Sequence, residues 1–150
     1  MAVWRIRKGF GGTLLEKVLS ARGLAESDLN PPLPRPDGLP NLKEAVQVVL
    51  SHLDSGSKVA VFGDYDCDGV CGAVVLEKIL RRLGADVVVR LPLRGEGYGI
   101  RPFHIRELAA QGVGLVVTVD NGVSGHEAVR AARDLGMSVV VTDHHELRGR

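Results

Sequence analysis

Short apolar runs alternate with amphipathic segments of helical spacing from residue 58 to residue 142. The apolar runs cover residues 59–62, 86–91, 115–119 and 138–142, and helical patterns fill residues 70–83, 102–111 and 128–135 between them. Strands that alternate with helices at this spacing are joined by right-handed crossovers and pair in parallel. We therefore predict an α/β fold: a doubly wound, mainly parallel sheet with helices on both faces.

The first 57 residues have a different character. Thr13 and Glu16 form a capping-box pattern that predicts a helix ending at Gly23, and Asn41 with Glu44 predicts the start of a second helix. Between them, the stretch 30–40 holds five of the seven prolines and predicts an extended connector. We expect residues 1–57 to be an N-terminal helical segment with a Pro-rich connector, and residues 58–150 to be an α/β core.

Composition limits the classes of function. Hydrophobic residues make up 45% and charged residues 25% of the 150 residues, which is typical of a globular domain, and the net charge is only +1. Whole-molecule charge therefore gives no argument for a nucleic-acid or membrane partner. No apolar run approaches membrane-spanning length and no signal core follows the N-terminus, while Cys67 and Cys71 lack common zinc spacing. We expect a cytoplasmic protein.

The segment KVAVFGDYDCDG, residues 58–69, places three acids directly after a predicted buried strand. In an extended segment Asp64, Asp66 and Asp68 would point to the same side, where their charges repel one another. A divalent cation between them relieves that repulsion. A calcium EF-hand is excluded because its loop needs a glutamate at the position that Val75 occupies.

Acids and histidines also follow the later predicted strands. Asp120 follows the third strand, and Asp143, His144 and His145 follow the fourth. Ligand sites of open parallel sheets lie outside the carboxyl ends of the strands, so these side chains should meet the first three acids. Mixed imidazole and carboxylate ligands suit manganese, iron or zinc better than calcium. The pattern predicts a site in which two metal ions activate a water for phosphoryl hydrolysis.

A glycine-rich loop after the second predicted strand offers groups for a substrate. Arg90, Arg94 and Arg101 surround the sequence Gly95-Glu96-Gly97-Tyr98-Gly99, which combines guanidinium groups for phosphates with one aromatic ring for stacking. Without the acids nearby, this loop would be interpreted as a solvated connection. Beside them, we predict that Arg94, Tyr98 and Arg101 bind substrate.

The motifs GDYDCDG, TVDNG and TDHH, in this order, resemble the first three motifs of the DHH phosphoesterase superfamily. The sequences WRIR, LPNLKEAV and EGYG and the Asn30-Pro31 connector are similar to the amino-terminal part of the RecJ family of single-strand-specific 5′ to 3′ DNA exonucleases. The resemblance covers nearly all 150 residues. It implies a substrate of single-stranded DNA held by its 5′ end, a role in DNA repair and recombination, and two Mn²⁺ or Mg²⁺ ions.

The resemblance also implies roles for particular residues. Metal ligands and catalytic residues are implied at Asp66, Asp68, Asp120, His144 and His145, and Asp64 is implied as a further, less direct metal ligand. Smaller phosphatases of the superfamily carry a histidine where this chain has Phe62. RecJ-type enzymes also carry a fourth aspartate motif, so we expect the core to be incomplete at its C-terminal end and these 150 residues alone to be inactive or weakly active.

Three alternatives stay open at this point. The string Asp66-Cys67-Asp68-Gly69-Val70 fits the haloacid-dehalogenase phosphatase signature, although that mechanism needs a later lysine and none follows Lys78. The chain could also be a DHH phosphoesterase that acts on small molecules or oligonucleotides. Finally, it could be a non-catalytic metal-binding or interaction module, because a fold alone does not give a function.

Overall fold

The computed structural model describes residues 8–33 and 35–146, and the chain divides into two compact units, Met1–Pro40 and Asn41–Arg150. The first unit contains α1 (Leu14–Arg22) and two short 3-10 helices, η1 (Glu26–Leu29) and η2 (Pro36–Gly38). Thr13 and Glu16 form the predicted capping box, and Gly23 ends α1 in the left-handed conformation. The sequence WRIR lies outside the described residues.

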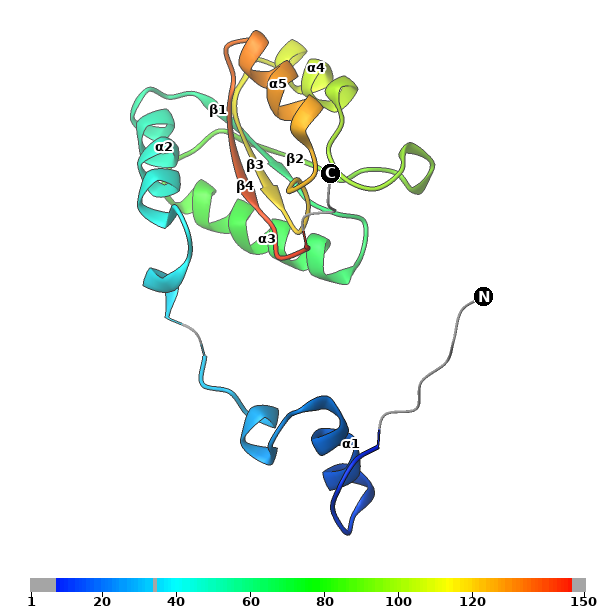
Figure 1. The fold of residues 1–150 in the computed structure, drawn as a ribbon. Helices are drawn as coiled ribbons and strands as arrows, with labels where there is room; N and C mark the ends of the chain where they lie inside the picture. Colours follow the sequence, from blue (N-terminus) through cyan, green and yellow to red (C-terminus); the bar gives the residue numbers. More distant parts are fainter. Residues whose placement is uncertain (1–7, 34, 147–150) are drawn as a thin grey trace. The chain divides into compact units, whose positions relative to one another are not determined.

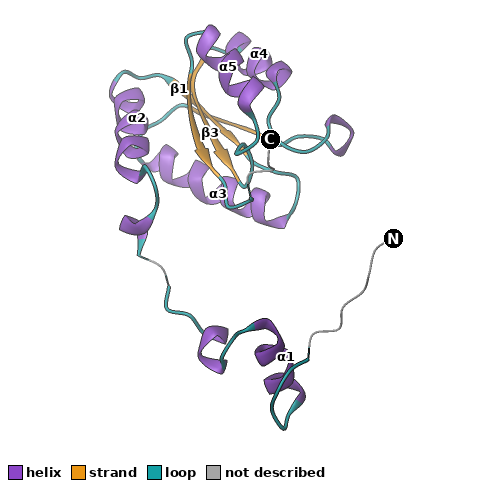
Figure 2. Ribbon diagram, in the orientation of Figure 1, coloured by secondary structure: helices purple, strands orange, loops and turns teal. Residues whose placement is uncertain are grey.

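The second unit is a parallel four-stranded sheet with helices on both faces, as Figure 1 and Figure 2 show. The strands are β1 (Lys58–Phe62), β2 (Val87–Arg90), β3 (Val113–Val119) and β4 (Ser138–Thr142), in the order β2-β1-β3-β4. The helices are α2 (Leu42–Asp54), α3 (Cys67–Arg82), α4 (Pro102–Ala110) and α5 (His126–Asp134), and a 3-10 helix, η3 (Arg94–Glu96), lies in the loop after β2. The α/β fold predicted from the alternation is confirmed.

Alternate residues of each strand supply two separate cores. Ala60 and Phe62 of β1 pack with Val116 of β3 against α4 and α5, whereas Val59 and Val61 pack against α2 and α3. This alternation is the expected result of a strand buried on both faces, which explains the continuous apolar runs in the sequence. None of the described helices combines the length and the apolar character needed to cross a membrane.

Helix α2 belongs to the sheet unit, so the structural division falls after Pro40 and not at the expected residue 57. The reason is packing, because Ala45, Val48 and Val49 of α2 lie against the core formed by β1, β3 and α3. The helix also begins differently from the prediction. Asn41 adopts a left-handed conformation with φ of 55° and its side chain caps nothing, so the capping box predicted with Glu44 is wrong.

Two further local predictions are wrong. Helix α3 begins at Cys67 and not near residue 70, because the Asp66 side chain accepts a hydrogen bond from the Gly69 N–H and caps it. Asp64, Asp66 and Asp68 therefore do not lie along one extended segment. Helix α5 begins at His126 and not at residue 128; it has no side-chain cap, and a 2.8 Å hydrogen bond from Gly125 N–H to Gly122 O closes the turn before it.

Candidate metal centre

The loop after β1 holds Asp64 and Asp66 in fixed positions at the carboxyl end of the sheet. The Asp64 side chain is buried and its Oδ1 accepts a 2.7 Å hydrogen bond from the Tyr65 N–H. Asp66 accepts a 3.0 Å hydrogen bond from Gly69 N–H through one oxygen. A Cβ atom on Gly69 would lie 2.4 Å from the Asp64 nitrogen, so only glycine lets α3 begin this close to Asp64.

Asp120 follows β3 and lies at the centre of the candidate site. Its side chain is 6% exposed, and its backbone has a φ of 62°, an uncommon value for a residue other than glycine. The next residue, Asn121, is fully buried and donates hydrogen bonds from Nδ2 to the carbonyl oxygens of Phe62 at 3.2 Å and Val119 at 2.9 Å. Asn121 therefore ties the ends of β1 and β3 together and fixes Asp120 beside the first acids.

The two histidines after β4 approach Asp120 from the other side. His144 Nε2 lies 3.0 Å from Asp120 Oδ1 and 3.7 Å from Asp68 Oδ2, and His145 Nδ1 lies 3.8 Å from Asp120 Oδ1. Asp143 supports this arrangement from behind: it accepts hydrogen bonds from the backbone N–H groups of Val123 at 2.9 Å and His145 at 3.0 Å. Its Oδ1 is also 2.7 Å from His145 Nδ1.

Two overlapping groups of potential metal ligands result, and Asp120 belongs to both. One group contains Asp120, His144 and His145, the other Asp64, Asp66 and Asp120, and within each group one ligand atom per residue lies within 4.8 Å of the others. Asp68 joins through its contact with His144. The predicted ligands thus come together from three strand ends, and their donor chemistry, carboxylate oxygen with imidazole nitrogen, fits manganese-type divalent ions.

The charges in the site are arranged as a cation site would require. Burial raises the pKa of Asp120, and the neighbouring carboxylates of Asp68 and Asp66 raise it further. At Asp143 burial acts to raise the pKa, but the hydrogen bonds from Val123 and His145 outweigh burial and lower it. The hydrogen bond to Asp143 raises the pKa of His145. The carboxylates around Asp120 destabilise one another, which a bound cation would relieve.

The loop between β2 and α4 brings Tyr98 into the same site. Tyr98 donates a 3.1 Å hydrogen bond from its hydroxyl to the Asp120 carbonyl oxygen, and the hydroxyl lies 3.0 Å from His145 Nδ1. Burial, with the charges of Asp143, Asp64, Asp120 and Asp66, raises the pKa of Tyr98 to about 12. Tyr98 therefore contacts a potential metal ligand directly, a contact that the interpretation as a stacking residue did not include.

The other two predicted substrate residues lie on the same loop. The Arg94 guanidinium lies over the Tyr65 ring, 5.0 Å from its centroid, within cation–π range. Arg101 precedes α4, and its guanidinium covers Gly97, where a Cβ atom would lie 2.7 Å from Arg101 Nη2. Arg94 is thus placed beside the loop of Asp64 and Asp66, whereas Arg101 packs on its own loop.

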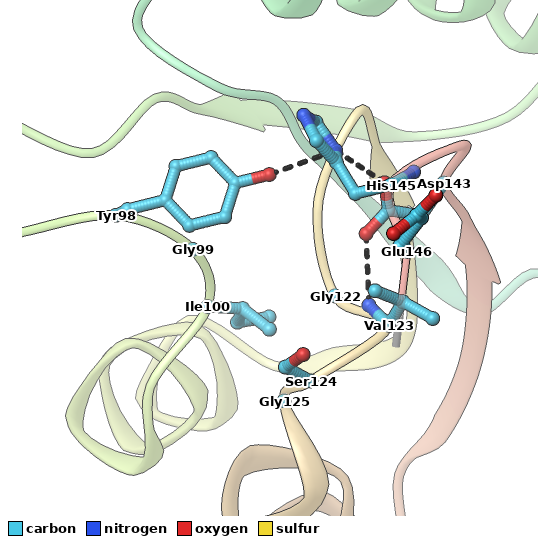
Figure 3. Close-up of a pocket in the computed structure, with 10 residues that line it drawn as sticks. All are labelled: Tyr98, Gly99, Ile100, Gly122, Val123, Ser124, Gly125, Asp143, His145 and Glu146. Atoms are coloured by element: carbon cyan, nitrogen blue, oxygen red, sulfur yellow. Dashed lines mark hydrogen bonds and ion pairs between the residues drawn. The ribbon is translucent and has the colours of Figure 1, made fainter. Parts of the chain in front are cut away.

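A pocket of about 470 Å³ opens beside His145 (Figure 3). Figure 3 shows Tyr98 and Ile100 on one wall and Ser124 with the Gly122–Gly125 backbone on another, while His145 and Asp143 close one end. Its volume lies within the range of small-ligand sites. The pocket therefore offers space for part of a substrate next to the candidate ligands.

Comparison with known proteins places this geometry in a family. Residues 58–150 match the DHH family, N-terminal domain. The chain belongs to the DHH family. This membership sets aside the haloacid-dehalogenase interpretation, in which Asp66 would be a covalent nucleophile.

Several curated relatives of this DHH chain are single-stranded-DNA-specific exonucleases named RecJ. The relative from Escherichia coli is 38% identical over 71% of this chain, and the one from Thermus thermophilus is 39% identical over 80%. This chain spans only 19% and 18% of their respective lengths.

Two solved structures share the fold of this DHH chain. A crystal structure of exonuclease RecJ bound to manganese superposes with a TM-score of 0.70 at 37% identity, covering 79% of this chain and 31% of the other. A structure of RecJ in complex with Mn²⁺ from Thermus thermophilus gives a TM-score of 0.64 at 35% identity, covering 81% of this chain and 17% of the other. At these identities the likeness extends beyond the fold to the sequence.

Sequence reasoning missed two residues that shape the DHH site. Asp143 was noted among the acids but not assigned a role, and the structure shows it holding His145. Asn121 was not considered at all, although it joins two strand ends. Its position directly after an acid at the end of a buried strand was the available signal.

Proposed function

We propose that this DHH chain carries the metal-binding part of a RecJ-like, metal-dependent phosphodiesterase that degrades single-stranded DNA from its 5′ end. The observation that carries the proposal is the sharing of Asp120 between two groups of carboxylate and imidazole ligands at one sheet edge. The relatives named single-stranded-DNA-specific exonucleases support the choice of substrate, and the two manganese-containing structures support the choice of ion.

We assign the metal ligands as Asp64, Asp66, Asp68, Asp120, His144 and His145, and the ions as a pair of Mn²⁺ or Mg²⁺. When bound, such ions activate a water and neutralise charge on the phosphate and the leaving oxygen. The chain's own residues position these groups: Asn121 fixes the strand ends and Asp143 orients His145. The proposed DNA substrate and the two free cysteines, Cys67 and Cys71, also favour a cytoplasmic protein.

Substrate contacts are assigned to Arg94, Tyr98 and Arg101. Arg94 supplies a permanent positive charge next to the first acids, which suits a backbone phosphate. Tyr98 and His145 both line the pocket, so a nucleotide in the pocket would lie against the Tyr98 ring. Together these groups would place a terminal phosphodiester at the ligand groups around Asp120.

The test is hydrolysis of a single-stranded oligonucleotide in the presence of manganese, with Asp120→Asn as the inactive reference. We expect mononucleotides to be released from the 5′ end, and a duplex of the same sequence to resist. Because the chain spans about a fifth of its curated relatives, the assay compares these 150 residues with a form extended beyond Arg150, which we expect to be the more active. Manganese binding without hydrolysis by either form would favour a binding module, and hydrolysis of short oligonucleotides alone would favour a smaller phosphoesterase.

A further inference from the structure

Glu96 connects three parts of the DHH core through one carboxylate. Its Oε1 accepts a 2.8 Å hydrogen bond from Arg90 Nη2 at the end of β2, and its Oε2 accepts a 2.7 Å hydrogen bond from the Leu93 N–H. The same Oε2 lies 3.4 Å from His104 Nε2 on α4. The loop of residues 91–101 is therefore attached to the strand before it and to the helix after it by one side chain.

The His104 side chain is held in place by burial, by two aromatic rings and by a hydrogen bond. Its side chain has no solvent exposure, and its ring lies 4.8 Å from the Phe62 ring and 3.9 Å from the Phe103 ring, centroid to centroid. Nδ1 accepts a 3.1 Å hydrogen bond from the Arg101 N–H, so in the neutral ring the proton is on Nε2, which faces Glu96. Burial lowers the pKa of His104, which favours the neutral ring.

The segment that Glu96 holds has a glycine on each side of Tyr98. Gly97 and Gly99 flank Tyr98 with φ values of 84° and 79°, so the chain turns through left-handed conformations on both sides of that ring. At the far end of the loop, the Tyr98 hydroxyl reaches the candidate site through its hydrogen-bond contacts with His145 and with the Asp120 carbonyl oxygen. The direction of Tyr98 therefore depends on what fixes residue 96 on one side and on the buried Ile100 on the other.

We propose that Glu96 and His104 are positioning residues that hold the 91–101 loop against the metal centre and so present Tyr98 and Arg94 to the substrate strand. This inference rests on the proposed function and adds two residues to it. Both act through Tyr98 and Arg94, since their own hydrogen bonds outside the pair are with Arg90, Leu93 and Arg101.

The mechanism is a change in population. Without the Glu96 carboxylate the loop samples open conformations. The apparent affinity for the DNA strand then falls in proportion to the fraction of molecules in which the loop is closed. Saturating substrate restores the closed loop, so the cost falls on KM and not on kcat. Metal affinity is preserved because no ligand is removed.

The experiment compares Glu96→Gln with Glu107→Gln in the form that hydrolyses DNA. Both substitutions remove a carboxylate that contacts Arg90, but Glu107 lies on α4 and its hydrogen bonds go to Arg90 and not to residues 91–101. In Glu96→Gln the amide nitrogen cannot accept a hydrogen bond, so the contact with Arg90 or with the Leu93 and His104 donors is lost. We expect a roughly tenfold higher KM for a single-stranded oligonucleotide with unchanged kcat and manganese affinity, and no such change in Glu107→Gln. Glu96→Asp, which keeps the charge on a shorter side chain, should recover part of the loss.

Amide hydrogen exchange of residues 91–101 tests the positioning role without any activity. We expect faster exchange in Glu96→Gln and parent-like exchange in Glu107→Gln. If the parent does not hydrolyse or bind DNA, the proposed function fails. The exchange result still decides whether Glu96 holds the loop of residues 91–101 in place. Equal KM changes in the two variants, or a lower melting temperature in Glu96→Gln with parent-like loop exchange, would overturn the inference.

Discussion

Asp143 and His145, separated by one residue in the chain, are joined by a 2.7 Å hydrogen bond between Oδ1 and Nδ1. The Asp143 side chain is buried, and it also accepts the N–H groups of Val123 and His145, so it cannot turn away from the imidazole. Carboxylates that hold a ligand histidine in this way fix its ring orientation and its tautomer. The first residue of the DHH motif, Asp143, therefore orients the imidazole of the last one, His145.

Asp143→Asn should weaken manganese binding roughly tenfold, because a neutral amide replaces the carboxylate that orients His145. It should also lower the pKa of His145, since the carboxylate now raises it. Calorimetry with manganese measures the first effect, and NMR titration of the metal-free protein measures the second. Asp134→Asn, an exposed substitution on α5, serves as the control. An unchanged His145 pKa would contradict the role of Asp143.

Asp66→Asn separates the charge of Asp66 from its role as a helix cap. Asparagine still accepts the Gly69 N–H hydrogen bond, so α3 should keep its start and the melting temperature should change little. Manganese affinity should nevertheless fall by roughly tenfold or more, because a carboxylate ligand is lost. Calorimetry and thermal unfolding of the same sample check both outcomes, with Asp54→Asn on α2 as the reference. Parent-like affinity would remove Asp66 from the ligand set.

Gly69→Ala should destabilise the fold by about 1–3 kcal/mol, because its Cβ atom would lie 2.4 Å from the Asp64 nitrogen. The matched control is Gly95→Ala, where a Cβ atom would meet nothing within 4 Å, and it should stay within about 0.5 kcal/mol of the parent. Urea unfolding measures both. Similar stabilities for the two variants would show that α3 can move away from Asp64 at little cost.

The stability of the parent should depend on pH through Glu96. The hydrogen bond from Arg90, followed by that from Leu93, lowers the Glu96 pKa from 4.5 to about 2 in the folded protein. Since the folded pKa is the lower one, the stabilisation is present above pH 4.5 and is lost as the pH falls towards about 2. The difference in unfolding free energy between parent and Glu96→Gln should therefore shrink from pH 5 to pH 2. A constant difference over that range, measured by urea unfolding, would be inconsistent with a lowered pKa.

Arg94→Ala should weaken single-strand binding and reduce the slope of log affinity against log salt by about 1, because one phosphate contact is lost. Fluorescence anisotropy with a labelled oligonucleotide at several salt concentrations measures the slope. Arg82→Ala, at the exposed end of α3, removes the same charge far along the helix from Asp66 and should leave the slope unchanged. Identical slopes for the two variants would show that Arg94 does not contact phosphate.

The sequence was sufficient to predict the bounds of elements whose ends are marked by local signals. The apolar run 138–142 forms β4 with those bounds, and the Thr13 capping box forms as predicted, because the residues of each segment signal its ends directly. The start of α3 was misjudged since alternating aspartates suit both an extended segment and a helix cap. The choice depends on Gly69 packing against Asp64, a contact between an element and the loop before it. Asp143 could not be assigned because ligand and supporting carboxylates differ only in what surrounds them.

The left-handed backbone of Asp120 lowers the stability of the fold at a position whose carboxylate belongs to both groups of potential metal ligands. Its φ of 62° suits glycine better than aspartate, and its buried carboxylate is crowded by Asp66 and Asp68. Asp120→Gly would relax both the backbone and the charge repulsion, while removing the group shared by both ligand sets. Selection of variants for heat resistance alone would therefore tend to discard this residue, so thermostability screens of the DHH core need an activity filter at residue 120.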